Sequence, residues 1–440
     1  MENQTTRRPF YRKKRTWLTM LVLTPFAVVG FMALNGHWQL QNKLAALRDA
    51  GMPTNGEELN EFYKVPNGTT DSTVAWMTAI TLASDGEFQD ACKVQPIVGL
   101  TDTPVVGEDW TGLANARDFL AAHQKQMDAI RVAAEQGGAV RFPVDFRAGI
   151  NALLTDTQET RTLARLLTLD AHVSQRDEKP EQVLQDIIHT FALSDALQGE
   201  PCLISQLVRF AIYAIGCDNI QKFLPVCDWN DSQLAKLQDA VALLDARQAY
   251  SVAMAGERAT CLTTADQNAL LPGMAQSNKR EFLRLFAASE QAMESSWCEA
   301  MKQQFNIAVQ FHESASPIDK FRYTLVYLMF PATENATKTG ARTTARQLCV
   351  VAALAAERFR LANSEFPESL ASIPAEFLPT SFADNNWMDP FSDQPLKYLK
   401  DETGTTVYSI GEDRGDDGGD VLYSEDHSAT DVGIRIPLSR

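Results

Sequence analysis

One short segment near the C-terminus, residues 411–421, concentrates the side chains best suited to binding a metal ion. Its sequence, GEDRGDDGGDV, interleaves five carboxylates with four glycines. Ca²⁺ takes six to eight oxygen ligands from carboxylates and carbonyls, and glycines let the chain wrap closely around the ion. Carboxylates packed this closely also repel one another unless a cation is present. We therefore predict a structural calcium site, with a solvated acidic turn as the alternative; the candidate ligands are Asp413, Asp416, Asp417 and Asp420.

No other cluster in the sequence has the spacing of a metal or catalytic site. The acidic segment is not an EF-hand, because Gly415 stands at the third position counted from Asp413, where a ligand is needed. His312-Glu313 begins a zincin motif, but Ser316 replaces its second histidine. Nucleophile-elbow, phosphate-loop and dinucleotide-binding motifs are absent from the sequence. We therefore assign no catalytic residue and expect no cofactor beyond calcium.

The seven cysteines form no Cys-x-x-Cys pair. Disulfides are permitted outside the inner membrane, and Cys217 with Cys227 would close a short loop, but spacing alone does not decide the pairing. The alternative is that cysteines among apolar helical residues are buried small hydrophobic side chains.

The charge of the chain argues against a nucleic-acid partner. The 440 residues carry a formal net charge of −16, whereas nucleic acids are bound by basic surfaces. The positive charge is also concentrated, because residues 1–16 hold six basic side chains and one acidic side chain, Glu2. The remainder is therefore more acidic than the total indicates.

An uncharged run, WLTMLVLTPFAVVGFMAL at 17–34, directly follows this basic block. At ~1.5 Å per residue, a helix of this length approaches the ~30 Å hydrocarbon core of a bilayer. Trp17 and Trp38 stand at its two ends, where aromatic rings prefer the headgroup region. We predict a transmembrane helix over 17–36. The positive-inside rule makes 1–16 a cytoplasmic tail and places the bulk of the chain outside a bacterial inner membrane.

A cleaved signal peptide is the alternative for this segment. Its apolar region usually has ~7–15 residues and precedes a small-x-small cleavage site. The run here is longer, and Phe31 is large for the −3 position of a cleavage after Ala33. Leu40, Leu44 and Leu47 recur at helical spacing and predict that the helix continues beyond the membrane.

The chain beyond the membrane is predicted to be mainly helical. Residues 37–110 are expected to hold a juxtamembrane helix and an irregular connection, and 111–330 a helical domain. Apolar residues there recur at spacings of three and four, and Asn230 with Gln233 predicts a capping box. Short polar turns favour antiparallel hairpins, in an irregular bundle or a hairpin array. The expected helices are 113–135, 157–174, 180–198, 201–224 and 230–249.

The C-terminal part, 342–440, changes character and is predicted to be a small α+β module. A domain boundary is expected within 313–347, where Pro317, Pro331 and a threonine-rich stretch lie. A helix over 342–363 is then followed by short antiparallel strands. Their expected positions are 395–400, 405–410 and 433–438.

Residues 355–420 resemble the globular end of the major pseudopilin of type II secretion systems. The similar pieces are RFRLANSEFPESL (358–370), MDPFSDQPLKYL (388–399) and VYSIGEDRGDDGGDV (407–421). The resemblance implies a helix packed on a small sheet, and a calcium-binding loop whose ligands would be Asp413, Asp416 and Asp420. The chain departs from that family because some 300 residues separate the membrane span from this unit, and because it lacks the family's N-terminal signature.

The whole layout also resembles a set of membrane-anchored helical proteins of planctomycete-type bacteria. The similar pieces are LRDAGMPTNGEELNEFY (47–63), EPCLISQLVRFAI (200–212) and the C-terminal motif. This resemblance implies no particular activity. We expect a single-pass protein whose non-catalytic helical domain binds other envelope proteins outside the membrane. The alternatives are a relative of a secretion or pilus-like apparatus and an envelope enzyme with an unrecognised site.

Overall fold

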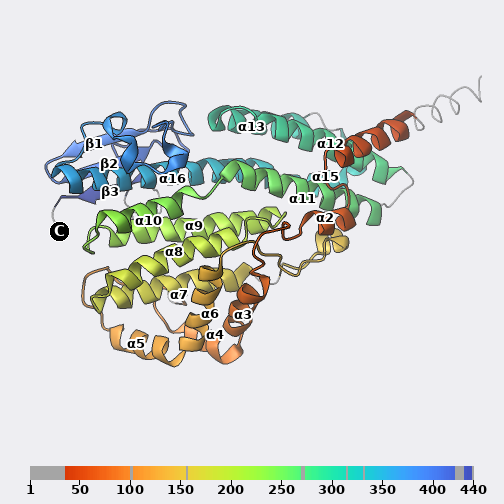
Figure 1. Cartoon of the computed structure of the whole chain (residues 1–440). Coiled ribbons are helices and arrows are strands. Elements are labelled where there is room, and N and C mark those ends of the chain that lie inside the picture. The colour runs from red at the N-terminus through yellow and green to blue at the C-terminus, as the bar shows by residue number, and fades with distance from the viewer. Residues whose placement is uncertain are drawn as a thin grey trace, which may run out of the picture.

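The computed structural model describes residues 35–99, 103–154, 157–268, 273–313, 316–330, 332–421 and 431–438. Figure 1 shows an elongated stack of helices with a small sheet at one end. The N-terminal helix α1, whose described part covers 35–49, lies at the opposite end (red in Figure 1). The predicted mainly helical class with a small C-terminal antiparallel sheet is confirmed.

The regular elements follow one another with short connections. The helices are α2 (Gly56–Phe62), α3 (Thr73–Ala83), α4 (Gly86–Lys93), α5 (Leu113–Ala122), α6 (Gln124–Gln136), η1 (Phe146–Asn151), α7 (Thr157–Arg176), α8 (Pro180–Ala196), α9 (Leu203–Phe223), α10 (Asp231–Ala242), α11 (Ala246–Gln267), α12 (Met274–Ala292), α13 (Trp297–Glu313), α14 (Pro317–Arg322), α15 (Thr324–Met329), α16 (Ala332–Asn363), η2 (Leu370–Ser372), η3 (Ala375–Phe377) and η4 (Thr380–Phe382). The strands are β1 (Lys397–Asp401), β2 (Gly404–Ser409) and β3 (Val432–Pro437).

Consecutive helices pack side by side because each presents an apolar stripe to its neighbour. Helices α7, α8 and α9 form one such layer, and α11 with α12 forms another. Val183, Ile187 and Phe191 of α8, spaced by four residues, are all buried in the largest core. The predicted capping box at Asn230 and Gln233 is confirmed at the start of α10.

The long helix α16 connects the helical layers to the C-terminal sheet. It contacts α9, α10, α11 and α13 as well as β2 and β3. Its residues 349–356 (CVVAALAA) are all buried, and the alanines there allow close approach of elements on every side. The sheet has the order β1-β2-β3 and is antiparallel throughout. The C-terminal module and the helical layers therefore share one hydrophobic core.

Three helix limits differ from the sequence-based expectation. The single helix expected over 113–135 is α5 and α6, broken at His123, whose ring packs against Phe88 and Phe119. The helix expected over 230–249 ends at Ala242, and Asp245 caps the start of α11.

The expected helix start at 342 is also displaced. Helix α16 begins at Ala332, so the threonine-rich stretch is helical rather than a connection between domains. Threonines are tolerated in this helix because their hydroxyls find acceptors in the carbonyls four residues back, as Thr337 does at Thr333 and Thr343 at Thr339.

The expected membrane helix, 17–36, falls outside the described residues except for its last two positions. Within the described part of the chain, no helix combines the length and apolar character needed to cross a bilayer. The helix predicted from the spacing of Leu40, Leu44 and Leu47 is present as α1. Leu40 and Leu44 are buried there against Leu262 of α11 and Leu283 of α12.

Candidate functional site

The C-terminal motif segments meet around a buried carboxylate, Asp389. Its Oδ1 accepts hydrogen bonds from the Phe391 amide at 2.9 Å and the Ser409 hydroxyl at 2.6 Å. Its Oδ2 accepts a hydrogen bond from the Ile410 amide at 3.3 Å. A charged acceptor with several donors stabilises the surrounding fold more than a neutral one. Asp389 therefore fixes the start of the acidic loop relative to the preceding turn.

A second set of contacts joins the Phe366-Pro367 turn to strand β1. The Tyr398 hydroxyl donates to the Pro367 carbonyl at 2.8 Å, and Lys400 Nζ donates to the Phe366 carbonyl at 2.9 Å. The three segments that carry the pseudopilin resemblance thus bond to one another, although they are separated in the sequence.

The predicted calcium loop follows β2, and its aspartates bond mainly to nearby backbone. Asp416 Oδ1 accepts from the Gly418 amide at 3.1 Å and the Tyr408 hydroxyl at 3.0 Å, while Lys397 Nζ lies 3.4 Å from Oδ2. The Gly418 amide is the main reason why the pKa of Asp416 is lowered. Asp413 Oδ1 accepts from the Gly415 amide at 3.1 Å.

These aspartates do not converge on one point. Among the described residues, no three acidic, histidine or cysteine side chains are grouped so that they could hold a metal ion. Calcium at Asp413, Asp416, Asp417 and Asp420 therefore stays a prediction.

The sequence analysis missed Asp431, which the fold brings beside this loop. Its Oδ2 accepts from the Gly419 amide at 2.8 Å, while its Oδ1 is buried without a hydrogen-bond partner. Burial raises the pKa of this carboxyl group. Its position directly before the apolar β3 is visible in the sequence, but the proximity of Asp431 to the acidic loop depends on the folded sheet.

A groove of about 240 Å³ lies between α9 and α16. Apolar residues of α9, such as Leu207 and Phe210, form one wall, and Arg342 and Arg346 of α16 form the other. Arg346 pairs with Asp218 at 3.4 Å. Arg342 is exposed and has no ion-pair or hydrogen-bond partner among the residues that the structure describes.

A smaller cavity of about 20 Å³ shares both arginines and reaches Asp431. Guanidinium groups bind carboxylates and phosphates with directed hydrogen bonds. The groove therefore suits a ligand group with an anionic end and an apolar body. Two arginines four residues apart on a helix are also common on surfaces, so the sequence alone did not single them out.

A buried acidic pair lies elsewhere, between α7 and α8. Asp170 is paired with Arg131 of α6, and Asp186 is completely buried beside Asp170. Burial raises the pKa of both carboxyl groups, and the neighbouring Asp170 raises that of Asp186 further. Gln182 Nε2 donates to Asp186 Oδ1 at 2.9 Å. The pair belongs to the packing of the helices, and the described cavities do not reach it.

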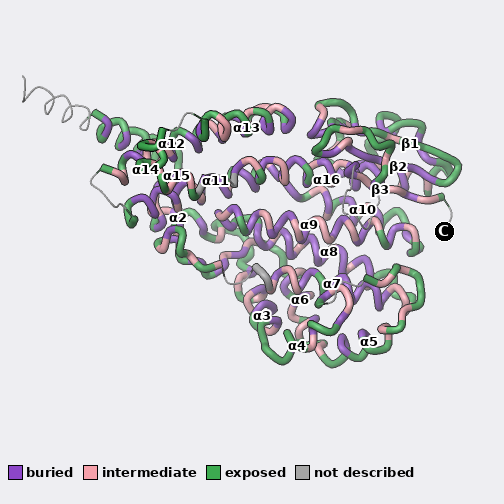
Figure 2. Tube along the Cα trace, turned by 180° about the vertical axis from the view of Figure 1, so that it is seen from behind, coloured by how far each residue is buried: buried purple, intermediate pink, exposed green. Residues whose placement is uncertain are grey.

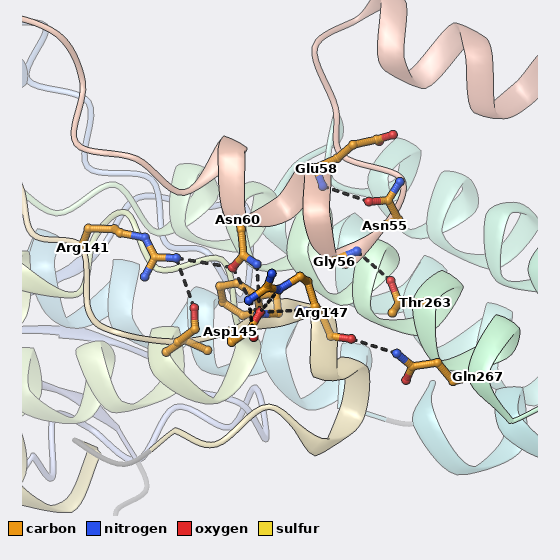
Figure 3. A network of polar contacts seen from close by, with 11 residues as sticks. Asn55, Gly56, Glu58, Asn60, Arg141, Asp145, Arg147, Thr263 and Gln267 are labelled. Atoms are coloured by element: carbon orange, nitrogen blue, oxygen red, sulfur yellow. Dashed lines mark hydrogen bonds and ion pairs between the residues drawn. The ribbon is translucent and has the colours of Figure 1, made fainter.

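A network of polar contacts fixes α2 to the loop that carries η1 (Figure 3). Asn60 Nδ2 donates to Asp145 Oδ1 at 3.0 Å, and Asn60 Oδ1 accepts from the Phe146 amide at 3.2 Å. Arg141 Nη2 donates to the side-chain oxygen Oδ1 of Asn60 at 3.4 Å and to the Val144 carbonyl at 3.1 Å. Asn60 thus joins two segments through both ends of its side-chain amide.

The same network reaches α11. The Gly56 amide donates to Thr263 Oγ1 at 2.7 Å, and Gln267 Nε2 donates to the Arg147 carbonyl at 2.8 Å (Figure 3). A Cβ atom at Gly56 would lie 2.1 Å from the Phe146 carbonyl oxygen, so only glycine allows this approach. The segment between α1 and the helical layers is therefore held rigidly.

The cysteines form no disulfide. All seven are free thiols, including Cys217 and Cys227, and six are buried. Burial raises the pKa of the Cys217 thiol to about 12 and that of the Cys92 thiol to about 11. The Cys217 and Cys92 thiols therefore stay protonated and unreactive at neutral pH.

Comparisons with known proteins give no relative for this chain. No protein-family model, no curated protein and no solved structure matches it.

Proposed function

We propose that this chain is a single-pass protein of a bacterial inner membrane that holds a helical interaction domain outside the membrane. Residues 17–36 would cross the bilayer, 1–16 would remain in the cytoplasm, and the described domain would face the envelope. Its partners would be envelope proteins, and we assign it no reaction.

The rigid junction next to the apolar run is the observation that carries this proposal. The described part of helix α1 starts at residue 35, directly after the run, and Leu40 and Leu44 bury it against α11 and α12. The network around Asn60 then fixes the following segment. A helix so firmly packed would set the orientation of the domain relative to the bilayer, which a partner-presenting domain requires.

Protease accessibility tests the topology. The full chain, carrying one tag at each terminus, is produced in a bacterium whose outer membrane is then permeabilised. Added protease should remove the C-terminal tag and leave the N-terminal tag on a short protected fragment. Retention of both tags would place the domain in the cytoplasm and contradict the proposal. Loss of the N-terminal tag before protease is added would indicate a cleaved leader instead.

The second candidate function is a relative of the type II secretion pseudopilins. The observation that favours it is the convergence of the three similar segments on Asp389 and on the Phe366-Pro367 turn. This likeness concerns the C-terminal module, and pilus assembly would require partners that co-purify with the full chain.

Calcium binding tests this second candidate. Thermal unfolding of the full chain in detergent is recorded with Ca²⁺, with Mg²⁺ and with a chelator. Free Ca²⁺ at 100 times its dissociation constant should stabilise the native state by ~2.7 kcal/mol. Asp413→Ala combined with Asp416→Ala should abolish this gain. An unchanged midpoint in all conditions would leave the loop as a solvated acidic turn.

A further inference from the structure

Four large apolar side chains are exposed at the end of the molecule where α1 begins. They are Trp38 of α1, Ile150 of η1, and Ile318 and Phe321 of α14, with exposed fractions of 57–76%. We call them the apolar end surface. Isolated exposed apolar residues are normal, but a group from separate segments at one end indicates an interaction surface.

Helix α14 is held at this end by its contacts with the start of α12. Arg322 donates to Ser277 Oγ at 3.1 and 3.0 Å, and Asn278 Nδ2 donates to the Arg322 carbonyl at 3.0 Å. No residue of α14 is buried. Because Ile318 and Phe321 are three residues apart, they lie on one face of the helix.

The first described residues of α1 contact the same turn of α12. A Cβ atom at Gly36 would lie 2.2 Å from Arg280 Nη1, which places Gly36 directly against Arg280. Arg280 is one turn, or ~4.5 Å along the axis, from Ser277. Leu40 and Leu44, further along α1, pack against Leu283. Helix α1 therefore runs from the first turns of α12 toward its middle.

This direction places α14 near the N-terminal end of α1. The contacts of α14 with Ser277 and Asn278 are nearer the start of α12 than the contact of Gly36 with Arg280. Figure 2 shows α14 and α15 at the same end as α1, opposite the sheet.

The η1 segment reaches this end through α11. The Ile150 amide donates to Thr264 Oγ1 at 3.0 Å, close to the end of α11. Asp266 in that last turn pairs with Lys279 of α12, so the end of α11 and the start of α12 are level. Ile150 is therefore held near the end of α11, beside the first turns of α12.

We propose that the apolar end surface rests in the headgroup and acyl boundary of the bilayer that residues 17–36 cross. This inference rests on the proposed membrane anchor. The anchor fixes the occupant, because the apolar run ends at residue 34 and Gly36 lies against Arg280 of α12, near the Ser277 and Asn278 that hold α14. Apolar and aromatic side chains partition into this boundary.

Quenching by brominated lipids tests this contact in the full chain. Ile318→Cys and Phe321→Cys are each labelled with an environment-sensitive fluorophore, and the proteins are placed in nanodiscs of phosphatidylethanolamine and phosphatidylglycerol. Leu243→Cys, equally exposed at the end of α10, is the control. Because six native cysteines are buried, the unsubstituted chain measures the small remaining background.

Brominated acyl chains should lower the fluorescence at 318 and 321 by about twofold or more, with little change at 243. Equal quenching at all three positions, in a protein that stays in the nanodisc, would overturn the contact and leave the anchor intact. Loss of the protein from the nanodisc would overturn the anchor and the contact together. If the fluorescence at 318 and 321 reports an apolar environment only in nanodiscs that hold two copies of the chain, the surface contacts a second copy, which would also overturn the contact with lipid.

Discussion

At the scale of single residues, the packing of Gly256 shows how little space separates the helical layers. A Cβ atom there would lie 1.7 Å from the Pro201 carbonyl oxygen, a backbone atom just before α9. Gly256→Ala should therefore destabilise the fold by ~1–3 kcal/mol, because α11 must move away from this backbone. Urea unfolding measures the change.

Gly86→Ala is the matched control for this substitution. Gly86 opens α4, and nothing lies within 4 Å of a Cβ atom placed on it. This variant should be neutral or slightly more stable, since alanine is the better helix residue by ~1 kcal/mol or less. Equal losses in both variants would contradict the close approach at Gly256.

The buried carboxyl group of Asp186 should make the free energy of unfolding depend on pH. Its pKa is raised well above the ordinary aspartate value by burial and by Asp170. The folded state therefore retains a proton that the unfolded state releases as pH rises above the ordinary aspartate pKa. By linkage, the stabilisation is complete below that pH and is lost as pH rises toward the higher folded pKa.

Asp186→Asn should remove this dependence. Relative to the unsubstituted chain, the variant should gain stability at pH 8 compared with pH 4, as measured by urea unfolding across that range. Asp239→Asn, at an exposed position of α10, is the control. If the difference in free energy of unfolding between the variant and the unsubstituted chain stays constant with pH, Asp186 does not have a raised pKa in the folded state.

At the scale of elements, the network around Asn60 predicts a local loosening. Asn60→Ala removes three hydrogen bonds and leaves the Phe146 amide without its acceptor. The cost should be ~1–3 kcal/mol. Hydrogen exchange should accelerate in 56–63 and 141–151 while α7 to α10 keep their protection.

Asn115→Ala, on the exposed side of α5, is the control for this experiment. If both asparagine variants leave exchange in 56–63 unchanged, the network does not hold α2, and the rigid junction loses its main support.

Local signals in the sequence were sufficient for much of the fold. The capping pattern at Asn230 and Gln233, the apolar spacing of α7 to α9 and the short strand-like runs all depend on neighbours within a few residues. The predicted helix limits were wrong where tertiary contacts decide them, as at His123, whose ring packs edge-on against Phe88 of α4. The predicted start of α16 was wrong for a related reason, because its threonine-rich stretch is tolerated in a packed helix.

The candidate site was predicted less completely than the fold. The acidic loop and Asp389 stand out as a motif, whereas Asp431 and the groove at Arg342 need the fold to bring distant segments together. Four nearby aspartates in a sequence indicate charge density, but not whether their oxygens point to one place. In the folded loop, Asp413 and Asp416 accept hydrogen bonds from the backbone amides of Gly415 and Gly418.

At the scale of the whole molecule, the described part of α1 and the sheet lie at opposite ends of an elongated domain (Figure 1). A bilayer at the α1 end would leave the sheet and the arginine groove facing the envelope. The same arrangement would bring the apolar end surface onto the membrane. The anchor is therefore the claim on which the remaining proposals depend.

Alkaline carbonate extraction of membranes from cells that produce the full chain tests this claim most directly. We predict that the chain stays in the membrane pellet after carbonate and high salt, is released by detergent, and has its full mass of 48.7 kDa. A chain in the supernatant, or one shortened by cleavage near Ala33, would contradict the membrane anchor.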